Sequence, residues 1–274
     1  MSKVALVTGG SSGIGESAAE ELLKKGFVVY AVARRVDRMA DLAANGVQTF
    51  AMDVTDDASM VAGIERIIAE QGRIDVLVNN AGYGSYGAVE DVPIDEARRQ
   101  FEVNLFGLAR LCQLVSPHMR EQGSGRIINI SSIGARLYEP FGAWYHATKF
   151  AVEGFSSSLR MELKPFGIHV CCVAPAGVMT EWNPIARDAL LETSGDTAYG
   201  KYAQRAFKVL EAADKPMMSS KPRVVGRKIA KAATARWPRP VYPVGKGARM
   251  IRTTFDLLPE GGTDQIISRA YGSR

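Results

Sequence analysis

The sequence predicts a doubly wound α/β fold, in which one parallel sheet of seven strands has helices on both faces. Two observations lead to this fold class. Short β-branched runs alternate with helical stretches along the whole 274-residue chain, without a low-complexity linker or a repeat. Several runs, among them VALV, FVVYAV and IINI, are continuously apolar, as is typical of strands buried on both faces of a covered parallel sheet. We therefore expect a single domain over residues 1–274.

Each expected strand is a short run rich in β-branched or apolar residues. The strands are Val4–Thr8, Phe27–Ala33, Val47–Met52, Val76–Asn79, Arg126–Ser131, His169–Ala174 and Val241–Val244. The stretches between them that are long enough for crossover helices are Gly15–Lys25, Asp56–Gln71, Asp95–Glu121 and Trp144–Lys164. Residues at about 181–222 are expected to form a substrate lid, and residues at about 245–274 a basic C-terminal extension.

Composition indicates a folded soluble protein, since 46% of the residues are hydrophobic and 23% are charged. The first apolar run, Val4 to Val7, is too short for the apolar region of a signal peptide, and no later run approaches the length of a membrane span. We therefore expect a cytoplasmic protein without a transmembrane segment.

The cysteines and histidines form no disulfide framework and no metal-binding pattern. The cysteines are odd in number and two are adjacent in an apolar run, so buried thiols are expected. The histidines are scattered, without a second ligand at metal spacing, and no metal is expected. These residues are Cys112, Cys171, Cys172, His118, His146 and His169.

Positive charge is concentrated towards the C-terminus. The net charge is +5, yet residues 221–254 contain ten basic residues and no acid, so the rest of the chain is acidic. Arg223, Arg227 and Lys231 repeat at helical spacing opposite apolar positions, which predicts a solvated stripe on an amphipathic helix. An anionic membrane surface is an alternative partner for this stretch. Nucleic acid is not expected, because no recognition motif or stacking platform accompanies the charge.

A glycine-rich loop, TGGSSGIG at residues 8–15, joins the first strand to the first helix. Glycines allow a tight turn and a close approach of the backbone to a ligand, and free N–H groups at the start of the helix suit a pyrophosphate. A tight turn alone would not need so many glycines. The candidate residues for dinucleotide binding are Gly9, Ser11, Ser12, Gly13, Ile14 and Gly15.

The residues after the second strand bear on the choice of cofactor. In dinucleotide folds an acid here binds the ribose 2′-hydroxyl, whereas an arginine accommodates a 2′-phosphate. This chain has Arg34 and Arg35, and no acid precedes Asp37. A planar guanidinium can bind a phosphate through two hydrogen bonds. The pair favours NADP(H) over NAD(H), with solvated surface charge as the alternative.

Tyr145 stands four residues before Lys149 in the run WYHATKF. On a helix this spacing places both side chains on one face, close enough to interact. An amphipathic helix can carry the same pair by accident, with the tyrosine in the core and the lysine in solvent. The pair alone does not decide between a catalytic and a structural role.

Taken together, five motifs resemble those of the short-chain dehydrogenase/reductase family and occur in the family's order. They are TGGSSGIG at 8–15, NNAG at 79–82, Asn104, Ser132 and YHATK at 145–149. The resemblance extends from Lys3 to about Val244. It implies a Rossmann fold and an oxidoreductase that uses NAD(H) or NADP(H).

The resemblance also implies the roles of four residues. Tyr145 is the catalytic acid or base, and Lys149 holds the nicotinamide ribose and lowers the tyrosine's pKa. Ser132 positions the substrate oxygen, and Asn104 supports a proton-relay water. These roles are chemically reasonable, because a free tyrosine has a pKa of about 10 and nearby positive charge favours its phenolate.

Further cofactor contacts follow from the same resemblance. An acid after the third strand meets the adenine, small residues after the fourth strand lie near the cofactor, and the segment after the sixth strand binds the carboxamide. The corresponding residues are Asp53, Val54, Asn80, Ala81, Gly82, Pro175, Gly177, Val178 and Thr180. Asp53 can also simply begin the turn into the next helix. Ala176 stands where the family usually has glycine, which puts the backbone path there in question.

The substrate pocket of the family draws on segments that are rich in aromatic residues here. Tyr138, Trp144 and Trp182 are the candidate pocket residues, with core packing as the alternative for each. Such residues predict a bulky hydrophobic carbonyl or alcohol as substrate. The C-terminal region resembles the hydroxysteroid and retinol dehydrogenase-like branch of the family.

Two functions are therefore in competition. The first is an NADP(H)-dependent oxidoreductase that interconverts a hydrophobic ketone or aldehyde and its alcohol. The second is a sensor or scaffold that binds a dinucleotide without turnover; the presence of both Tyr145 and Lys149 favours the enzyme. By resemblance we expect a homodimer or homotetramer built through the two long helices.

Overall fold

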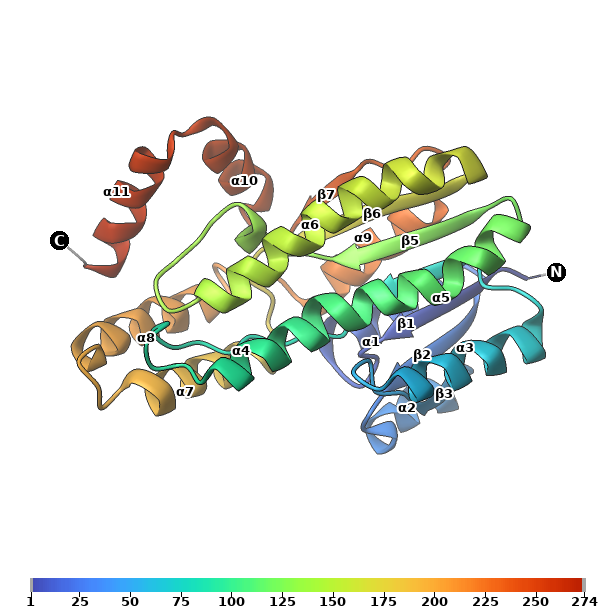
Figure 1. Ribbon diagram of the computed structural model, residues 1–274, viewed down its shortest axis with the longest axis horizontal. Helices are drawn as coiled ribbons and strands as arrows, with labels where there is room; N and C mark the ends of the chain where they lie inside the picture. The colour runs from blue at the N-terminus through green and yellow to red at the C-terminus, as the bar shows by residue number, and fades with distance from the viewer. Residues whose placement is uncertain (1, 273–274) are drawn as a thin grey trace.

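The computed structural model describes residues 2–272 and has a seven-stranded, fully parallel sheet in the order β3-β2-β1-β4-β5-β6-β7 (Figure 1). The strands are β1 Val4–Thr8, β2 Val28–Ala33, β3 Gln48–Ala51, β4 Val76–Asn79, β5 Gly125–Ile130, β6 Ile168–Pro175 and β7 Val241–Val244. All seven predicted strands are confirmed, with ends displaced by one residue at most. The strand order reverses between β1 and β4, which is where doubly wound sheets bind ligands.

Eleven α-helices lie in residues 2–272. They are α1 Gly13–Leu23, α2 Ala40–Ala44, α3 Asp57–Gln71, α4 Ile94–Phe101, α5 Gly107–Glu121, α6 Ala143–Leu163, α7 Trp182–Ser194, α8 Gly200–Asp214, α9 Pro222–Thr234, α10 Ala248–Leu257 and α11 Glu260–Tyr271. Short 3-10 turns η1, η3 and η4 occupy Val36–Met39, Ile133–Ala135 and Lys164–Phe166.

The helix predicted over Asp95–Glu121 is not uniform. A π-helical segment, η2 Glu102–Phe106, joins α4 to α5 and contains Asn104. Such segments are rare and frequently mark functional sites. Sequence periodicity missed it because one wider turn leaves the apolar pattern on both sides intact.

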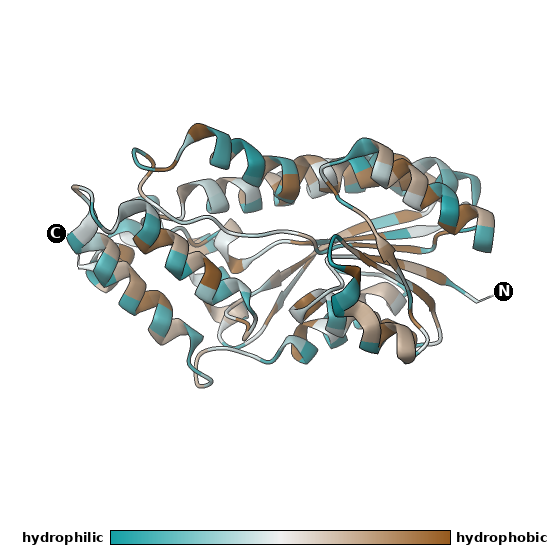
Figure 2. Cartoon of the chain, turned by 90° about the horizontal axis from the view of Figure 1, so that it is seen from below, coloured by the Kyte–Doolittle hydropathy of each residue, from teal (hydrophilic) through white to brown (hydrophobic). Residues whose placement is uncertain are grey.

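Hydrophobic cores on both faces hold the helices to the sheet (Figure 2). Because successive strand residues point to opposite faces, Val7 packs in the core with α1 and α9, and Leu6 in the core with α3, α5 and α6. The contact between α1 and α9 is close: a Cβ on Gly226 would lie 2.5 Å from the Ser17 carbonyl oxygen. The predicted helices on both faces are thus confirmed.

The amphipathic stripe on α9 is also confirmed. Arg223, Arg227 and Lys231 are exposed, whereas Val225, Ile229 and Ala232 are buried. Two of the arginines approach Glu21 on α1, at 3.1 and 3.9 Å. The three cysteines are free and buried, as predicted. No helix within residues 2–272 is both long and apolar enough to span a membrane.

Four helices extend the fold beyond the carboxyl ends of the strands. Figure 1 shows α7, α8, α10 and α11 together at the end of the molecule away from the N-terminus. A third hydrophobic cluster lies here, formed from Tyr86, Ala186, Leu190, Ala203, Ala206 and Tyr271. The segment predicted as a lid and the segment predicted as an extension therefore pack against each other.

Candidate active site

A cleft of about 740 Å³ opens at the carboxyl ends of the strands, across the point where the strand order reverses. All predicted cofactor residues except Gly15 line it, together with Ser132, Tyr145 and Lys149. The cofactor residues concerned are Gly9, Ser11, Ser12, Gly13, Ile14, Arg34, Arg35, Asp53, Val54, Asn80, Ala81, Gly82, Pro175, Gly177, Val178 and Thr180. We call the part beside the glycine loop the cofactor end, and the part beyond Ser132 and Tyr145 the substrate end.

The glycine loop has the geometry that an anion site needs. Gly9 and Gly13 have positive φ angles of 66° and 60°, which L side chains rarely adopt. Gly15 lies below the loop, where a Cβ would fall 2.2 Å from the Gly9 carbonyl oxygen. Ser12 precedes α1 without a side-chain cap. The Ser12 side chain thus does not occupy the first N–H groups of α1, which can serve a pyrophosphate.

Hydrogen bonds hold the segment after β4 against this loop. The Asn80 side-chain amide donates to the Thr8 carbonyl oxygen at 2.9 Å, and the Ala81 N–H donates to Thr8 Oγ1 at 3.0 Å. A Cβ on Gly82 would lie 3.0 Å from Asn104 Oδ1 and 3.8 Å from Lys149 Nζ. The small residues here keep the cleft open beside the catalytic candidates.

The rim of the cofactor end carries positive charge. Arg34 and Arg35 are exposed and line the cleft. Asp53 also lines it, but its Oδ1 accepts the Thr55 N–H at 3.0 Å and the Thr55 hydroxyl at 2.8 Å. Burial opposes ionisation of Asp53, yet these two donors, with the charge of Arg34, lower its pKa. Asp53 therefore stabilises the turn that leads into α3, and it also faces the cleft.

The departure at Ala176 is accommodated without strain. Its N–H donates to the Val244 carbonyl oxygen at 2.9 Å, and its φ is not positive. Its methyl group faces Gly245, whose absent Cβ would lie 3.5 Å away. Across the cleft, Thr180 Cγ2 lies 3.0 Å from the position of a Cβ on Gly13. The segment after β6 thus closes over the glycine loop.

Ser132, Tyr145 and Lys149 come together at the junction of the two ends. Ser132 follows β5, and its hydroxyl accepts the Gly134 N–H at 3.0 Å. Lys149 Nζ donates to the Ile130 carbonyl oxygen at 3.0 Å and lies 5.8 Å from the centroid of the Tyr145 ring. The fold therefore brings the α6 pair to the end of the strand that precedes the serine.

The net effect of the protein on the pKa of Tyr145 is to raise it. Burial raises the pKa of Tyr145 to about 12; the Ser132 hydroxyl opposes this shift, and the charge of Glu139 adds to it. Burial likewise lowers the pKa of Lys149 to about 8. The lowering expected from Lys149 is not seen, because desolvation dominates.

Asn104 is buried at 1% exposure and serves as a structural tie. Its Oδ1 accepts the Tyr83 N–H at 3.0 Å, and its Nδ2 donates to the Tyr83 carbonyl oxygen at 2.8 Å and to Thr148 Oγ1 at 3.1 Å. Both amide hydrogens are engaged by the protein. The side chain thus connects the segment after β4 to α6 through hydrogen bonds.

The three predicted pocket residues differ in whether they line the cleft. Trp182 lines the cleft, with its ring centroid 5.0 Å from that of Tyr145. Tyr138 and Trp144, which were predicted to line the pocket, are not among the residues that line the cleft. The Tyr138 hydroxyl instead donates to Asp264 on α11 at 3.0 Å. Trp144 precedes Tyr145 on α6, and adjacent helical residues point about 100° apart.

Sequence reasoning missed several residues of the substrate end. They are Leu137, Glu139, His146, Ala186, Leu210, Met218 and Ile251. The apolar ones lie on helices or loops whose partners are distant in the chain, so no local pattern marks them. Glu139 could have been recognised from the sequence as a pocket residue, since this acid lies between Ser132 and Tyr145 in an aromatic segment.

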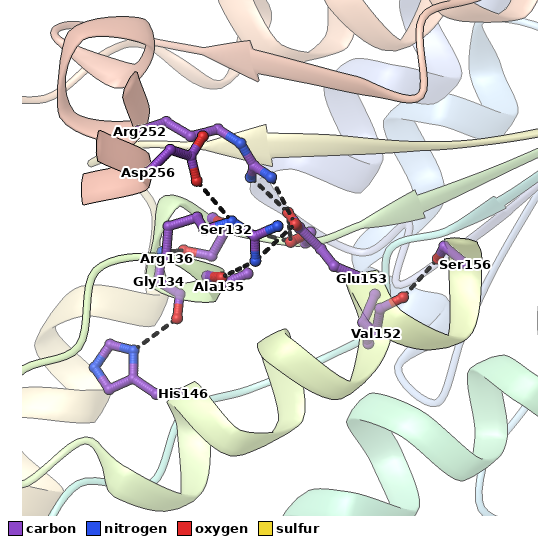
Figure 3. Close-up of polar contacts among 11 residues, drawn as sticks. Ser132, Gly134, Ala135, Arg136, His146, Val152, Glu153, Ser156, Arg252 and Asp256 are labelled. Atoms are coloured by element: carbon purple, nitrogen blue, oxygen red, sulfur yellow. Dashed lines mark hydrogen bonds and ion pairs between the residues drawn. The ribbon is translucent and has the colours of Figure 1, made fainter. Parts of the chain in front are cut away.

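A buried ion-pair network supports the serine loop (Figure 3). Glu153 on α6 accepts two 2.7 Å hydrogen bonds from Arg252 on α10, and a 2.8 Å bond from the Ser131 hydroxyl. Arg136 pairs with Asp256 at 2.8 Å. Glu153 and Arg252, which form the central pair, are only 6% and 9% exposed. The basic C-terminal segment is thereby fastened to the site.

Comparison with known proteins identifies the family. The family model described as short chain dehydrogenase matches residues 3–190. The chain belongs to the short-chain dehydrogenase family. This family uses nicotinamide dinucleotides, and the protein is accordingly an oxidoreductase acting on CH–OH or carbonyl groups.

Relatives of this short-chain dehydrogenase match it over most of their length. The 3-ketodihydrosphingosine reductase of Bacteroides thetaiotaomicron is 37% identical over 236 residues, covering 86% of this chain and 85% of the relative. The NADPH-dependent 3-dehydrocapnine reductase of Ornithobacterium rhinotracheale is 30% identical over 275 residues, covering 96% and 95%. The crystal structure of a short-chain dehydrogenase from Streptomyces avermitilis has a TM-score of 0.82 at 31% identity, covering 98% of both chains.

Proposed function

We propose that this protein is an NADP(H)-dependent oxidoreductase that interconverts a hydrophobic ketone or aldehyde and its alcohol by hydride transfer. The observation that carries the proposal is the meeting of Ser132, Tyr145 and Lys149 in the cleft that also contains the glycine loop. A proton donor, a hydroxyl for the substrate oxygen and an ammonium group thus adjoin the place for a dinucleotide.

The residues of the cofactor end fit a dinucleotide. The N–H groups at the start of α1 would bind its pyrophosphate, and Asn80 and Thr180 would border its nicotinamide half. When bound, the dinucleotide supplies a hydride to a carbonyl carbon or accepts one from an alcohol.

Tyr145 would exchange the proton. With a pKa of about 12, the phenol is protonated at neutral pH and can donate to the carbonyl oxygen as the carbon receives its hydride. Ser132 would donate a hydrogen bond to the same oxygen. Lys149, with a pKa of about 8, supplies positive charge that favours the phenolate left behind. These groups favour reduction, since oxidation must start from the phenolate.

The preference for NADP(H) rests on Arg34 and Arg35. Both are exposed at the cleft rim directly after β2, where a 2′-phosphate would lie. The name of the Ornithobacterium relative specifies NADPH, which supports the same preference here.

A long apolar chain suits the substrate end. Its lining includes Trp182, Leu137 and Leu210, and apolar walls with few polar groups favour hydrophobic ligands. The Bacteroides relative is named as a 3-ketodihydrosphingosine reductase, which supports a ketone as the substrate of this enzyme.

Residues 181–222 would act as the lid of a single domain spanning 1–274. The segment begins at Glu181, whose Oε2 accepts a 2.9 Å hydrogen bond from Arg38 on the cofactor side. Both side chains are at least one-third exposed, so the contact is weak enough to open and close.

Self-association through the long helices is a further part of the proposal. Phe106, Phe150 and Met161 are 53%, 40% and 66% exposed on η2 and α6. A homodimer or homotetramer would cover these apolar side chains. Light scattering behind gel filtration measures the mass directly.

Dinucleotide titration followed by turnover tests the proposed function. NADPH is expected to bind at least about tenfold more tightly than NADH, or about 1.4 kcal/mol, and long-chain ketones to be reduced with consumption of NADPH. Tighter binding of NADH would refute the role of the arginine pair. A sensor or scaffold would bind NADPH and consume none with any ketone.

A further inference from the structure

Glu139 is an acid at the substrate end whose carboxylate has no role in the chemistry described above. It lines the cleft with Ser132 and Tyr145, and its side chain is 17% exposed. Oε1 accepts a hydrogen bond from the Tyr86 hydroxyl at 2.9 Å, and Oε2 accepts one from the Tyr271 hydroxyl at 2.6 Å. The Tyr86 ring lies 6.0 Å from the Tyr145 ring, centroid to centroid.

Both phenols are neutral partners. Burial raises the pKa of Tyr86 and of Tyr271, and the charge of Glu139 raises both further. Each therefore remains protonated and donates one hydrogen bond. Two neutral donors orient the carboxylate and fix its position, but they leave its negative charge in place.

The part of the chain that the structure describes contains no lysine or arginine that balances this charge. Within residues 2–272, Glu139 makes no ion pair with a lysine or arginine. His146 Nε2 lies 4.0 Å from Oε1, but this nitrogen accepts the Glu139 N–H at 3.2 Å, and Nδ1 faces the Gly134 carbonyl oxygen at 2.9 Å. One accepting and one donating nitrogen correspond to a neutral imidazole.

Glu153 shows how the same protein treats a carboxylate that is only structural. It is buried 14 residues further along the chain, and Arg252 neutralises it through two 2.7 Å hydrogen bonds. A buried charge without such a partner is costly. The difference between the two acids is that Glu139 borders the cleft, from which a ligand can supply the missing cation.

We propose that Glu139 binds a positively charged amino group of the substrate, so that the enzyme acts on long-chain amino ketones and the corresponding amino alcohols. An ammonium offers three donors and a full positive charge, which a hydroxyl does not. The amine lies near the reacting carbon, because Glu139 and Tyr145 border the same part of the cleft. The proposal deepens the proposed function and rests on it for the reaction itself.

The C-terminal helix takes part in this recognition. Tyr271 reaches Glu139 from α11, 132 residues away in the chain. The helix therefore completes the amine site in addition to packing on α8. Tyr271→Phe should weaken amine binding by removing one of the two donors that hold the carboxylate.

Binding measured by calorimetry on the NADP⁺-loaded protein at pH 7 tests the inference without turnover. The probes are an alkyl 2-amino alcohol and the same compound with hydroxyl in place of the amine. The amine is expected to bind at least about tenfold more tightly, or about 1.4 kcal/mol. Equal affinity for the two probes in the native protein would overturn the inference, with no variant needed.

Two variants localise the effect. Glu139→Gln keeps the size of the side chain and should abolish the preference for the amine. Glu90→Gln is the matched control, because Glu90 also accepts a tyrosine hydroxyl, that of Tyr199 at 2.8 Å, but on the exposed surface. It should retain the full preference. A preference that survives in Glu139→Gln would assign the amine to another group and overturn the inference.

Turnover then separates this inference from the proposed function. If the amino ketone and its hydroxy analogue are reduced with equal kcat/KM, the reductase stands and the amine site is refuted. If neither is reduced, the proposed function fails for this substrate class. The binding comparison still decides the role of Glu139 in that case.

Discussion

The two ends of the cleft are built in different ways. At the cofactor end, the glycine loop, Arg34 and the segment after β4 come from the first 82 residues, and each follows directly on a strand. The substrate end combines residues that are far apart in the chain, such as Glu139 with Tyr271 and Glu153 with Arg252. Local backbone geometry thus determines the first end, whereas tertiary packing determines the second.

Electrostatics differ in the same way. Arg34 and Arg35 lie exposed at the rim of the cofactor end, where water screens charge. At the substrate end Glu153 and Arg252 are buried, and a buried charge is costly unless a partner compensates it. Substitutions should therefore affect affinity for the dinucleotide at one end, and stability, pH dependence and substrate choice at the other.

The largest effect outside the catalytic group is expected at Arg252. Arg252→Ala removes both 2.7 Å hydrogen bonds to the buried Glu153 and leaves it only the longer 3.7 Å ion pair with Arg136, which should lower the free energy of unfolding by up to about 3–5 kcal/mol. Arg223→Ala is the matched control, since Arg223 also pairs with a glutamate but is exposed; its cost should be about 0–1 kcal/mol. Urea unfolding measures both, and equal losses would refute the distinction between buried and exposed charge.

Arg34→Ala addresses the cofactor end. It should weaken NADPH binding by roughly 10- to 100-fold, or about 1.4–2.8 kcal/mol, and leave NADH binding almost unchanged. Arg98→Ala serves as the control, because Arg98 is an exposed arginine that pairs with the exposed Asp95. Fluorescence titration with both dinucleotides gives the comparison. Equal weakening of NADPH and NADH would reduce Arg34 to general surface charge.

The pH dependence reports on the junction of the two ends. Reduction needs Tyr145 protonated and Lys149 charged; their pKa values are about 12 and about 8. The kcat/KM for reduction should therefore be flat below pH 8 and fall by up to about tenfold per unit above it as Lys149 loses its proton. Stopped assays from pH 6 to 10 measure the profile. A rate that rises through pH 8 would contradict the role of charged Lys149.

The smallest effect concerns the walls of the substrate end. Trp182→Ala removes an aromatic contact beside Tyr145 and should raise KM for a long-chain ketone about three- to tenfold. Trp144→Phe should leave KM unchanged, because Trp144 lies outside the cleft. Initial-rate kinetics compare the two. A larger rise in KM for Trp144→Phe than for Trp182→Ala would contradict the position of Trp144 outside the cleft.

The contrast between the two ends also explains what the sequence could predict. The glycine loop, Arg34 and the Tyr145–Lys149 pair are local patterns next to strands or on one helix, and the fold brings them to one cleft. Tyr138 and Trp144 were misplaced because the direction of a side chain depends on its packing partners. The decisive partner of Tyr138 is Asp264, 126 residues away.

Other parts of the site depend on desolvation, which a sequence does not display. The spacing of Tyr145 and Lys149 predicted a lowered pKa for the tyrosine. The pKa is raised instead, because burial is the largest cause of the shift. The π-helical turn at Asn104 left the apolar pattern undisturbed. The assignment to the hydroxysteroid and retinol dehydrogenase-like branch stays a prediction.

The central claim is that Tyr145 is the proton donor of an NADPH-dependent reduction, and Tyr145→Phe tests it most directly. The variant keeps the ring and its packing against Trp182 and removes only the hydroxyl. The predicted result is an NADPH dissociation constant within about twofold of the native value, with kcat for ketone reduction lower by roughly 10²–10⁴-fold. Turnover by Tyr145→Phe at the native rate would contradict the account.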